Sequence, residues 1–222
     1  MEKTATKSAK KSITKAQLKK AYIEHVLTEE KEPRSVFAFA KRNKISEEEF
    51  YKHFNSLQVL ERSLWSDWFT EVTTMLEKDE TYRTYTLREK VLALYYSLFE
   101  QLRSNRSFAI YRFEGAKREP DPQFLRGMKE VFKEFIDGLV NEGKETGEVM
   151  DRPFANQYVQ AFWIQFLFVV RFWVHDESEG FAKTDAAIEK SVNLAFDLIG
   201  NGPIDRVIDF AKFLIQNNQR SL

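Results

Sequence analysis

The polar residues best placed to bind another molecule lie in one stretch, residues 34 to 60. Ser46 precedes Glu49 by three positions, which is the spacing of a capping box at the start of a helix. Asn43 and Lys44 join this helix to a short one before it. This pattern predicts a helix-turn-helix, whose chemistry is hydrogen bonding and charge pairing with DNA. The residues with the spacing to fill its small core are Phe39, Ala40, Ile45, Phe50 and Phe54.

The stretch resembles the head of the TetR family of transcription regulators. In that family the recognition helix ends with an aromatic run of the form (Leu or Phe)-Tyr-x-His-Phe, and the next helix begins with Ser-Lys-x-x-Leu. Here the run is Phe50-Tyr51-Lys52-His53-Phe54, followed by Asn55-Ser56-Leu57-Gln58-Val59-Leu60. The motif match covers residues 13 to 65. The resemblance implies an all-α fold, with an N-terminal three-helix helix-turn-helix head and a C-terminal helical bundle for ligand binding and dimerisation.

The resemblance also implies roles in DNA binding. Ser35 stands where the family has a phosphate-contacting Thr, and Ser56 would cap a helix whose N-terminus holds a DNA phosphate. Tyr51, Lys52 and His53 offer a phenol, an ammonium and an imidazole to the DNA backbone. Base reading falls to the first turn of the recognition helix. The implied DNA-binding residues are Ser35, Lys44, Ser46, Glu47, Glu48, Tyr51, Lys52, His53 and Ser56.

Three departures from the family pattern leave DNA binding open. Lys44 stands where the family has a turn glycine, so we expect a strained or altered backbone there. Leu57 replaces a phosphate-contacting Lys. The acidic residues 47 to 49 suit the helix dipole but repel phosphate, although a Glu can accept a hydrogen bond from cytosine N4.

The charge distribution suits a phosphate-binding head. The chain has no net charge, yet its first sixty residues hold thirteen basic and eight acidic side chains. Seven lysines and one acid fall within residues 1 to 20. This start is either a basic arm for DNA or a solvated disordered tail. We therefore divide the chain into a basic disordered arm (1–12), a helix-turn-helix DNA-binding domain (13–60) and a ligand-sensing and dimerisation domain (61–222).

Helices account for most of the chain, because glycine and proline are scarce, at eight and five in 222 residues. Pro33, Pro122, Pro153 and Pro203 mark helix starts, and Gly143, Gly147, Gly180, Gly200 and Gly202 mark helix ends. We expect helices at about 13–30, 34–42, 46–53, 56–78, 84–104, 106–114, 121–144, 153–176, 182–200 and 203–217.

The sequence lacks the residues that several classes of protein function require. There is no Cys, which excludes disulfides and thiolate metal sites. His25, His53 and His175 are the only histidines, and none has a metal-ligand spacing. Phosphate-binding glycine loops and nucleophile elbows are missing. We expect neither an enzyme nor a bound cofactor or metal. Without a signal peptide or a long apolar run, we expect a cytoplasmic protein that does not enter membranes.

One helix is apolar on nearly every side, from Tyr158 to Val174. Such a helix must be covered all round, which indicates a subunit interface. Ile188, Val192 and Phe196 give the next helix an apolar stripe as well. We therefore expect a homodimer formed through residues 153–176 and 182–217.

The aromatic rings of the larger domain either line an apolar cavity or fill the core. Two hypotheses remain for the protein. The first is a ligand-responsive, DNA-binding repressor. The second is a TetR-fold protein without DNA binding that carries a lipid-like ligand, as a resemblance to lipid-binding ubiquinone-biosynthesis proteins implies. The expected pocket residues are Tyr95, Phe99, Tyr111, Phe132, Phe135, Phe162, Trp163 and Phe166.

Overall fold

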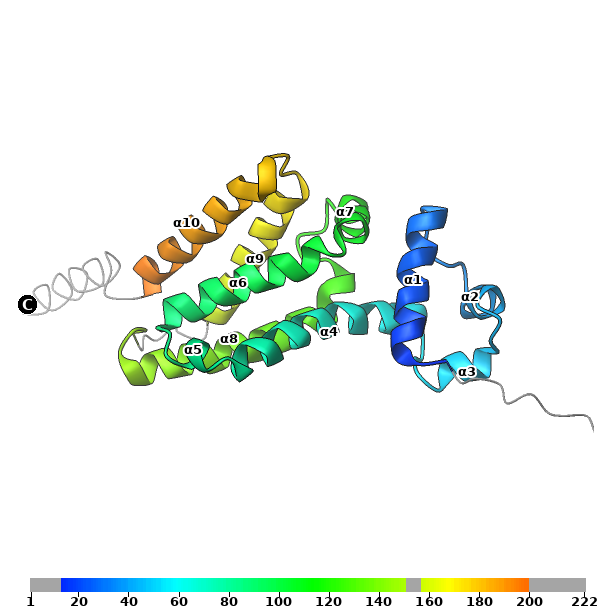
Figure 1. Cartoon of the computed structure of the whole chain (residues 1–222), viewed down its shortest axis with the longest axis horizontal. Coiled ribbons are helices and arrows are strands. Elements are labelled where there is room, and N and C mark those ends of the chain that lie inside the picture. Colours follow the sequence, from blue (N-terminus) through cyan, green and yellow to red (C-terminus); the bar gives the residue numbers. More distant parts are fainter. Residues whose placement is uncertain (1–12, 151–156, 200–222) are drawn as a thin grey trace, which may run out of the picture. The chain divides into compact units, whose positions relative to one another are not determined.

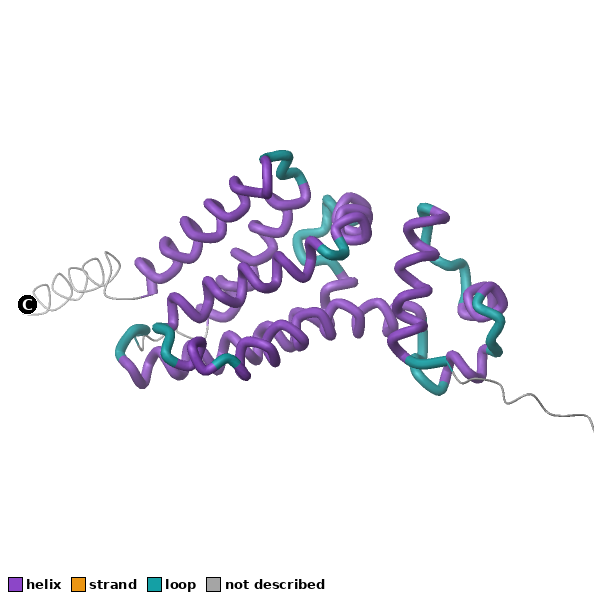
Figure 2. The backbone as a smooth tube through the Cα atoms, viewed as in Figure 1, coloured by secondary structure: helices purple, strands orange, loops and turns teal. Residues whose placement is uncertain are grey.

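The computed structural model describes residues 13–150 and 157–199, and within these ranges the chain folds into helices and loops without a strand (Figures 1 and 2). The predicted all-α class is confirmed. The basic arm, the helix predicted at 203–217, Pro153, Pro203, Gly200 and Gly202 lie outside the described residues. The helices are α1 (Lys15–Glu29), α2 (Val36–Arg42), α3 (Glu47–Tyr51), α4 (Leu57–Lys78), α5 (Glu80–Arg83), α6 (Leu87–Arg103), α7 (Arg106–Gly115), η1 (Gln123–Leu125), α8 (Arg126–Thr146), α9 (Tyr158–Val174), η3 (Glu179–Phe181) and α10 (Ala182–Ile199).

The chain divides into two compact units, residues 1–64 and 65–222. We call their described parts the head and the body. Both the division and the domain boundary predicted after residue 60 fall inside α4. None of the described helices is both long and apolar enough to cross a bilayer.

Aromatic rings form the core of the head. Leu18, Tyr22 and Val26 recur every fourth residue on α1, so all three point inward and are buried. Phe39 of α2 meets Tyr22 edge to face at 6.3 Å and Phe50 of α3 at 6.0 Å. These contacts hold the three short helices together, because edge-to-face ring pairs add to the free energy of burial.

The body packs α8 against α6 and α9, and α10 against α6 and α9 (Figure 1). Polar bonds cross two of its interfaces. The Tyr95 hydroxyl donates to the Phe162 carbonyl at 3.2 Å, which ties α6 to α9. Gln165 Nε2 donates to Ser191 Oγ at 3.1 Å, which ties α9 to α10. The body also contains all four tryptophans, each of them buried: Trp65, Trp68, Trp163 and Trp173.

Arg106 and Asp176 fix the corner where α9 ends and α10 begins. The Arg106 guanidinium donates to the carbonyls of Trp173, Val174 and Asp176, at 2.9, 3.3 and 3.3 Å. The Asp176 carboxylate accepts bonds from the N–H and hydroxyl of both Ser178 and Thr184. Burial alone would raise the pKa of Asp176, but these four bonds outweigh it and hold the pKa well below its usual range.

Three predicted helix boundaries were wrong, each for a local reason. The helix predicted from residue 84 begins at Leu87, because Thr86 and Glu89 form a capping box and a separate short helix, α5, precedes it. The helix predicted from residue 121 begins with the 3-10 turn η1. Gly143 lies inside α8 and does not end it. A Cβ at Gly143 would lie 2.7 Å from Val149 Cγ2 and still closer to Leu87, so the glycine permits close packing.

Candidate functional site

The turn between α2 and α3 has the geometry of a helix-turn-helix. The Lys44 N–H donates to the Lys41 carbonyl at 3.2 Å, and the Ile45 N–H to the Ala40 carbonyl at 3.0 Å. This pair of bonds is the Schellman motif, which places its C′ residue in the left-handed region. Lys44 occupies that position with φ of 57°. The expected strain at Lys44 is confirmed.

The N-terminus of α3 is capped by Ser46, whose Oγ accepts from the Glu49 N–H at 3.2 Å. The structure shows only this half of the predicted capping box. Glu49 instead pairs with Lys52 Nζ at 2.9 Å. The bond from Lys52, with a smaller contribution from the Ile13 backbone, lowers the pKa of Glu49. The same pair raises the pKa of Lys52. One acid of the recognition helix is therefore neutralised by a predicted phosphate-binding cation.

The other predicted DNA-binding side chains lie at the surface of the head. Ser35, Lys44, Ser46, Glu48 and Tyr51 are exposed, whereas Glu47, His53 and Ser56 are half-buried. Tyr51 is 50% exposed while its neighbour Phe50 is fully buried.

Ser35 and Ser56 serve as helix caps. The Ser35 Oγ accepts from the Ala38 N–H at 3.1 Å, and the Ser56 Oγ accepts from the Val59 N–H at 3.1 Å. In both bonds the serine hydroxyl acts as an acceptor, which leaves its hydrogen available for a phosphate oxygen.

Most of the predicted pocket rings form one packed cluster. Phe166 lies at its centre and meets the rings of Tyr95, Phe99, Phe132 and Trp163 within 5.3 to 6.3 Å. These five rings and Phe162 are all buried. Tyr111 and Phe135 are half-buried, and the ring of Phe135 meets that of Phe69 at 5.9 Å.

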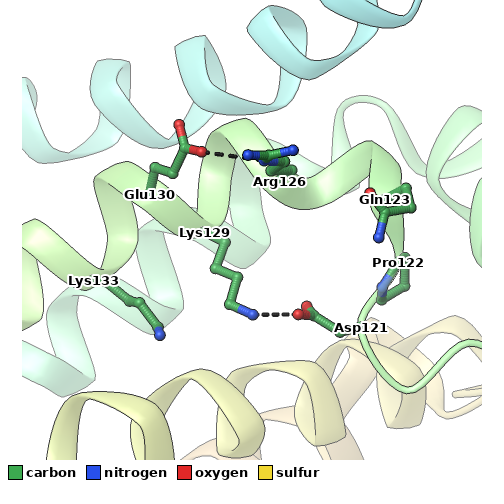
Figure 3. Close-up of a pocket in the computed structure, with 7 residues that line it drawn as sticks. All are labelled: Asp121, Pro122, Gln123, Arg126, Lys129, Glu130 and Lys133. Carbon is green, nitrogen blue, oxygen red and sulfur yellow. Dashed lines mark hydrogen bonds and ion pairs between the residues drawn. The ribbon is translucent and has the colours of Figure 1, made fainter.

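Two open grooves flank α8. The α8–loop groove, about 380 Å³, is lined by charged residues of α8 and of the loop before it (Figure 3). In it Lys129 pairs with Asp121, and Arg126 with Glu130 at 3.4 Å. Trp163 Nε1 donates to Asp121 at 3.0 Å, so this loop is fastened to α9.

The second groove, about 440 Å³, lies between α4 and α8, and we call it the α4–α8 groove. Of its lining residues, only Phe135 was predicted from the sequence to line a pocket. The signal that could have revealed more is Gly138, a glycine inside a strongly helical segment. The groove is lined by Phe69, Thr70, Thr73, Glu77, Val131, Glu134, Phe135, Gly138 and Leu139.

One protein family matches the chain by sequence. The sequence profile of the tetracyclin repressor-like C-terminal domain matches residues 90–214, more than half of the chain. No curated protein sequence matches the chain.

Several solved structures share the fold. A protein assigned to the TetR family from Syntrophomonas wolfei has a TM-score of 0.64 at 14% identity, covering 83% of this chain and 94% of its own. Another, from Shewanella sp. PV-4, has a TM-score of 0.60 at 16% identity, covering 84% and 98%. The fatty acid degradation regulator FadR from Bacillus halodurans has a TM-score of 0.57 at 19% identity, covering 84% and 96%. At these identities the likeness is one of fold.

Proposed function

The chain belongs to the tetracyclin repressor-like family, and from this membership we propose that it is a dimeric, ligand-responsive, DNA-binding regulator of the TetR type that represses transcription. The head would bind operator DNA, and the body would sense a small ligand. In this proposal the chain has no catalytic role, because it acts by binding alone.

The observation that carries DNA binding is the surface presented around α3. Tyr51 is half exposed on a five-residue helix whose inward ring, Phe50, is anchored against Phe39. Lys44 and the serine caps at 35 and 56 add a cation and two hydroxyls. Such groups bind the DNA backbone and position the head without reading sequence.

The acids of α3 give the head a means of reading bases. Glu47 and Glu48 form no ion pair with any described residue, so their carboxylates remain available. A carboxylate in the major groove accepts a hydrogen bond from cytosine N4. We propose that these two residues select cytosine and that the lysines offset their repulsion from phosphate.

The dimer interface is proposed on α9 and α10. Ile164, Phe168 and Phe172 follow one another at helical spacing on α9, and their side chains are 58, 59 and 38% exposed. Leu194 and Leu198 of α10 are exposed as well. Apolar surface of this kind favours association with a second copy, since one self-complementary patch suffices for a two-fold dimer.

A second candidate function rests on the same acids. Glu47 and Glu48 form no ion pair within the described part of the chain, while Lys52, a predicted phosphate-binding cation, is already paired with Glu49. A head with this charge arrangement would repel DNA. The body would then carry an apolar ligand without regulating transcription.

Selection from a random DNA pool distinguishes the two functions. A regulator is expected to enrich a sequence that binds better than bulk DNA at physiological salt. Its affinity should fall by roughly a thousandfold between about 50 and 200 mM salt, if a dimer makes about six phosphate contacts. Glu47→Gln with Glu48→Gln should relax the preference for cytosine. If no sequence is enriched, the ligand-carrier function takes the place of the repressor.

A further inference from the structure

We propose that the α4–α8 groove of the body binds an amphipathic organic cation, with the apolar part on the groove floor and the charged nitrogen between Glu77 and Glu134. The inference rests on the proposed ligand-sensing function and adds the chemical class of the ligand.

The groove is built from one face of each helix. Phe69, Thr73 and Glu77 recur every fourth residue on α4 and therefore lie in a row. Phe135 and Leu139 form the facing row on α8. A volume of about 440 Å³ lies within the range of about 300 to 1,000 Å³ typical of small-molecule sites.

The floor of the groove is apolar and aromatic. Phe69 is buried, and its ring meets the half-buried ring of Phe135 edge to face at 5.9 Å. Leu139 is buried beside them. An alkyl or aryl group gains free energy by covering such a surface, and an organic cation is also attracted to the ring faces.

The charged lining of the groove is entirely acidic. Glu77 lies on one wall and Glu134 on the other, and no Lys or Arg lines the groove. Neither glutamate side chain has an ion pair or hydrogen bond among the described residues. A ligand with a positive charge would supply the partner that both lack, whereas a carboxylate or phosphate would be repelled.

The opposite face of α8 provides a contrast. Its α8–loop groove contains Arg126, Lys129 and Lys133, and both of its acids are paired (Figure 3). The same helix therefore presents bases on one side and unpaired acids on the other. The acidic lining belongs to the α4–α8 groove in particular and is not a general property of α8.

Gly138 keeps the groove open. Glycine is the poorest helix former after proline, so a glycine inside α8 needs a reason. At Gly143 the reason is close packing against Leu87 and Val149. At Gly138 a Cβ would meet no atom within 4 Å. Close packing therefore does not explain this glycine, which is exposed and borders the open space of the groove.

Isothermal titration calorimetry on the full-length protein tests the proposal with two matched probes. Decyltrimethylammonium and decanoate, both kept below micelle formation, share an alkyl chain and differ in the sign of the charge. We expect the cation to bind at least about tenfold more tightly than the anion, because only the cation pairs with Glu77 and Glu134. Decanoate binding as tightly as the cation would overturn the proposal.

Three variants locate the site. Glu77→Gln with Glu134→Gln should weaken cation binding by about tenfold or more, since both charge contacts are lost. Gly138→Leu should abolish cation binding by filling the groove, and circular dichroism checks that it folds. Glu145→Gln removes an exposed α8 carboxylate outside the groove and should have no effect. Unchanged binding in the first two variants would also overturn the proposal. No DNA is present, so failure of DNA binding and failure of cation binding are separate results.

Discussion

At the scale of single residues, Lys44 combines strain with a charge that favours DNA binding. A non-glycine residue in the left-handed region costs about 1 to 2 kcal/mol. We expect Lys44→Gly to stabilise the head by about 1 kcal/mol in urea unfolding and, at the same time, to weaken DNA binding by removing a cation near phosphate. A variant that loses stability would show that the lysine side chain makes packing contacts more important than the strain.

His25 makes the stability of the head depend on pH. Both of its ring nitrogens are buried, and neither has a hydrogen-bond partner among the residues that the structure describes. Burial, together with repulsion from Arg42, lowers the pKa of His25 from its ordinary value of 6.5. The unfolded chain therefore takes up this proton more readily, so the free energy of unfolding should fall as the pH drops below about 6.5.

Urea unfolding followed by circular dichroism between pH 7.5 and 5.5 measures this effect. His25→Leu removes the titrating group. The free energy of unfolding of this variant should therefore change less with pH over the same interval. An equal pH dependence in the variant would show that His25 is not its source. Carboxylates such as Glu29, whose pKa is lowered chiefly by its hydrogen bond with Arg42, lose their contribution to stability only at lower pH.

At the scale of elements, the two interior glycines of α8 form a matched pair. Gly143→Ala should destabilise the body by about 1 to 3 kcal/mol, because the added methyl group meets Leu87 and Val149. Gly138→Ala should stabilise it by roughly 0.5 to 1 kcal/mol, because the methyl group enters open space and alanine favours the helix. Thermal unfolding of both variants checks the opposite signs.

Local signals in the sequence were enough to predict the helices and the turn of the head. The serine caps at 46 and 56 and the turn at Lys44 are contained within a few neighbouring residues, and the structure has all of them. Gly143 was misplaced at a helix end because its role depends on Leu87, far away in sequence. The α4–α8 groove was missed for the same reason, since its two walls come from distant helices.

Ring positions also show where sequence patterns stop being informative. Phe135 and Phe132 are three residues apart on one helix, yet Phe132 lies in the cluster around Phe166 while Phe135 lines a groove. Both contact Phe69. Only the packing of α4 and α9 on α8 distinguishes them, and helical periodicity alone does not contain that information.

At the scale of the whole molecule, association should depend on the exposed face of α9. Phe168→Glu places a charge in the proposed interface and should give a monomer of unchanged helical content in sedimentation. Phe37→Glu is a matched control, because Phe37 is 60% exposed on α2 and Phe168 is 59% exposed. The control should remain dimeric. Dimers in both variants would place the interface elsewhere.

The placement of the four tryptophans gives the body an optical signature that the head lacks. Indole emission reports the environment of the body alone, since residues 1–64 contain no tryptophan. Unfolding of the head should therefore change the far-ultraviolet circular dichroism while leaving the tryptophan spectrum almost untouched. If the two units unfold independently, the unfolding curves from circular dichroism and from tryptophan emission will have different midpoints. Coincident midpoints would indicate that the units unfold together, and neither measurement needs a label.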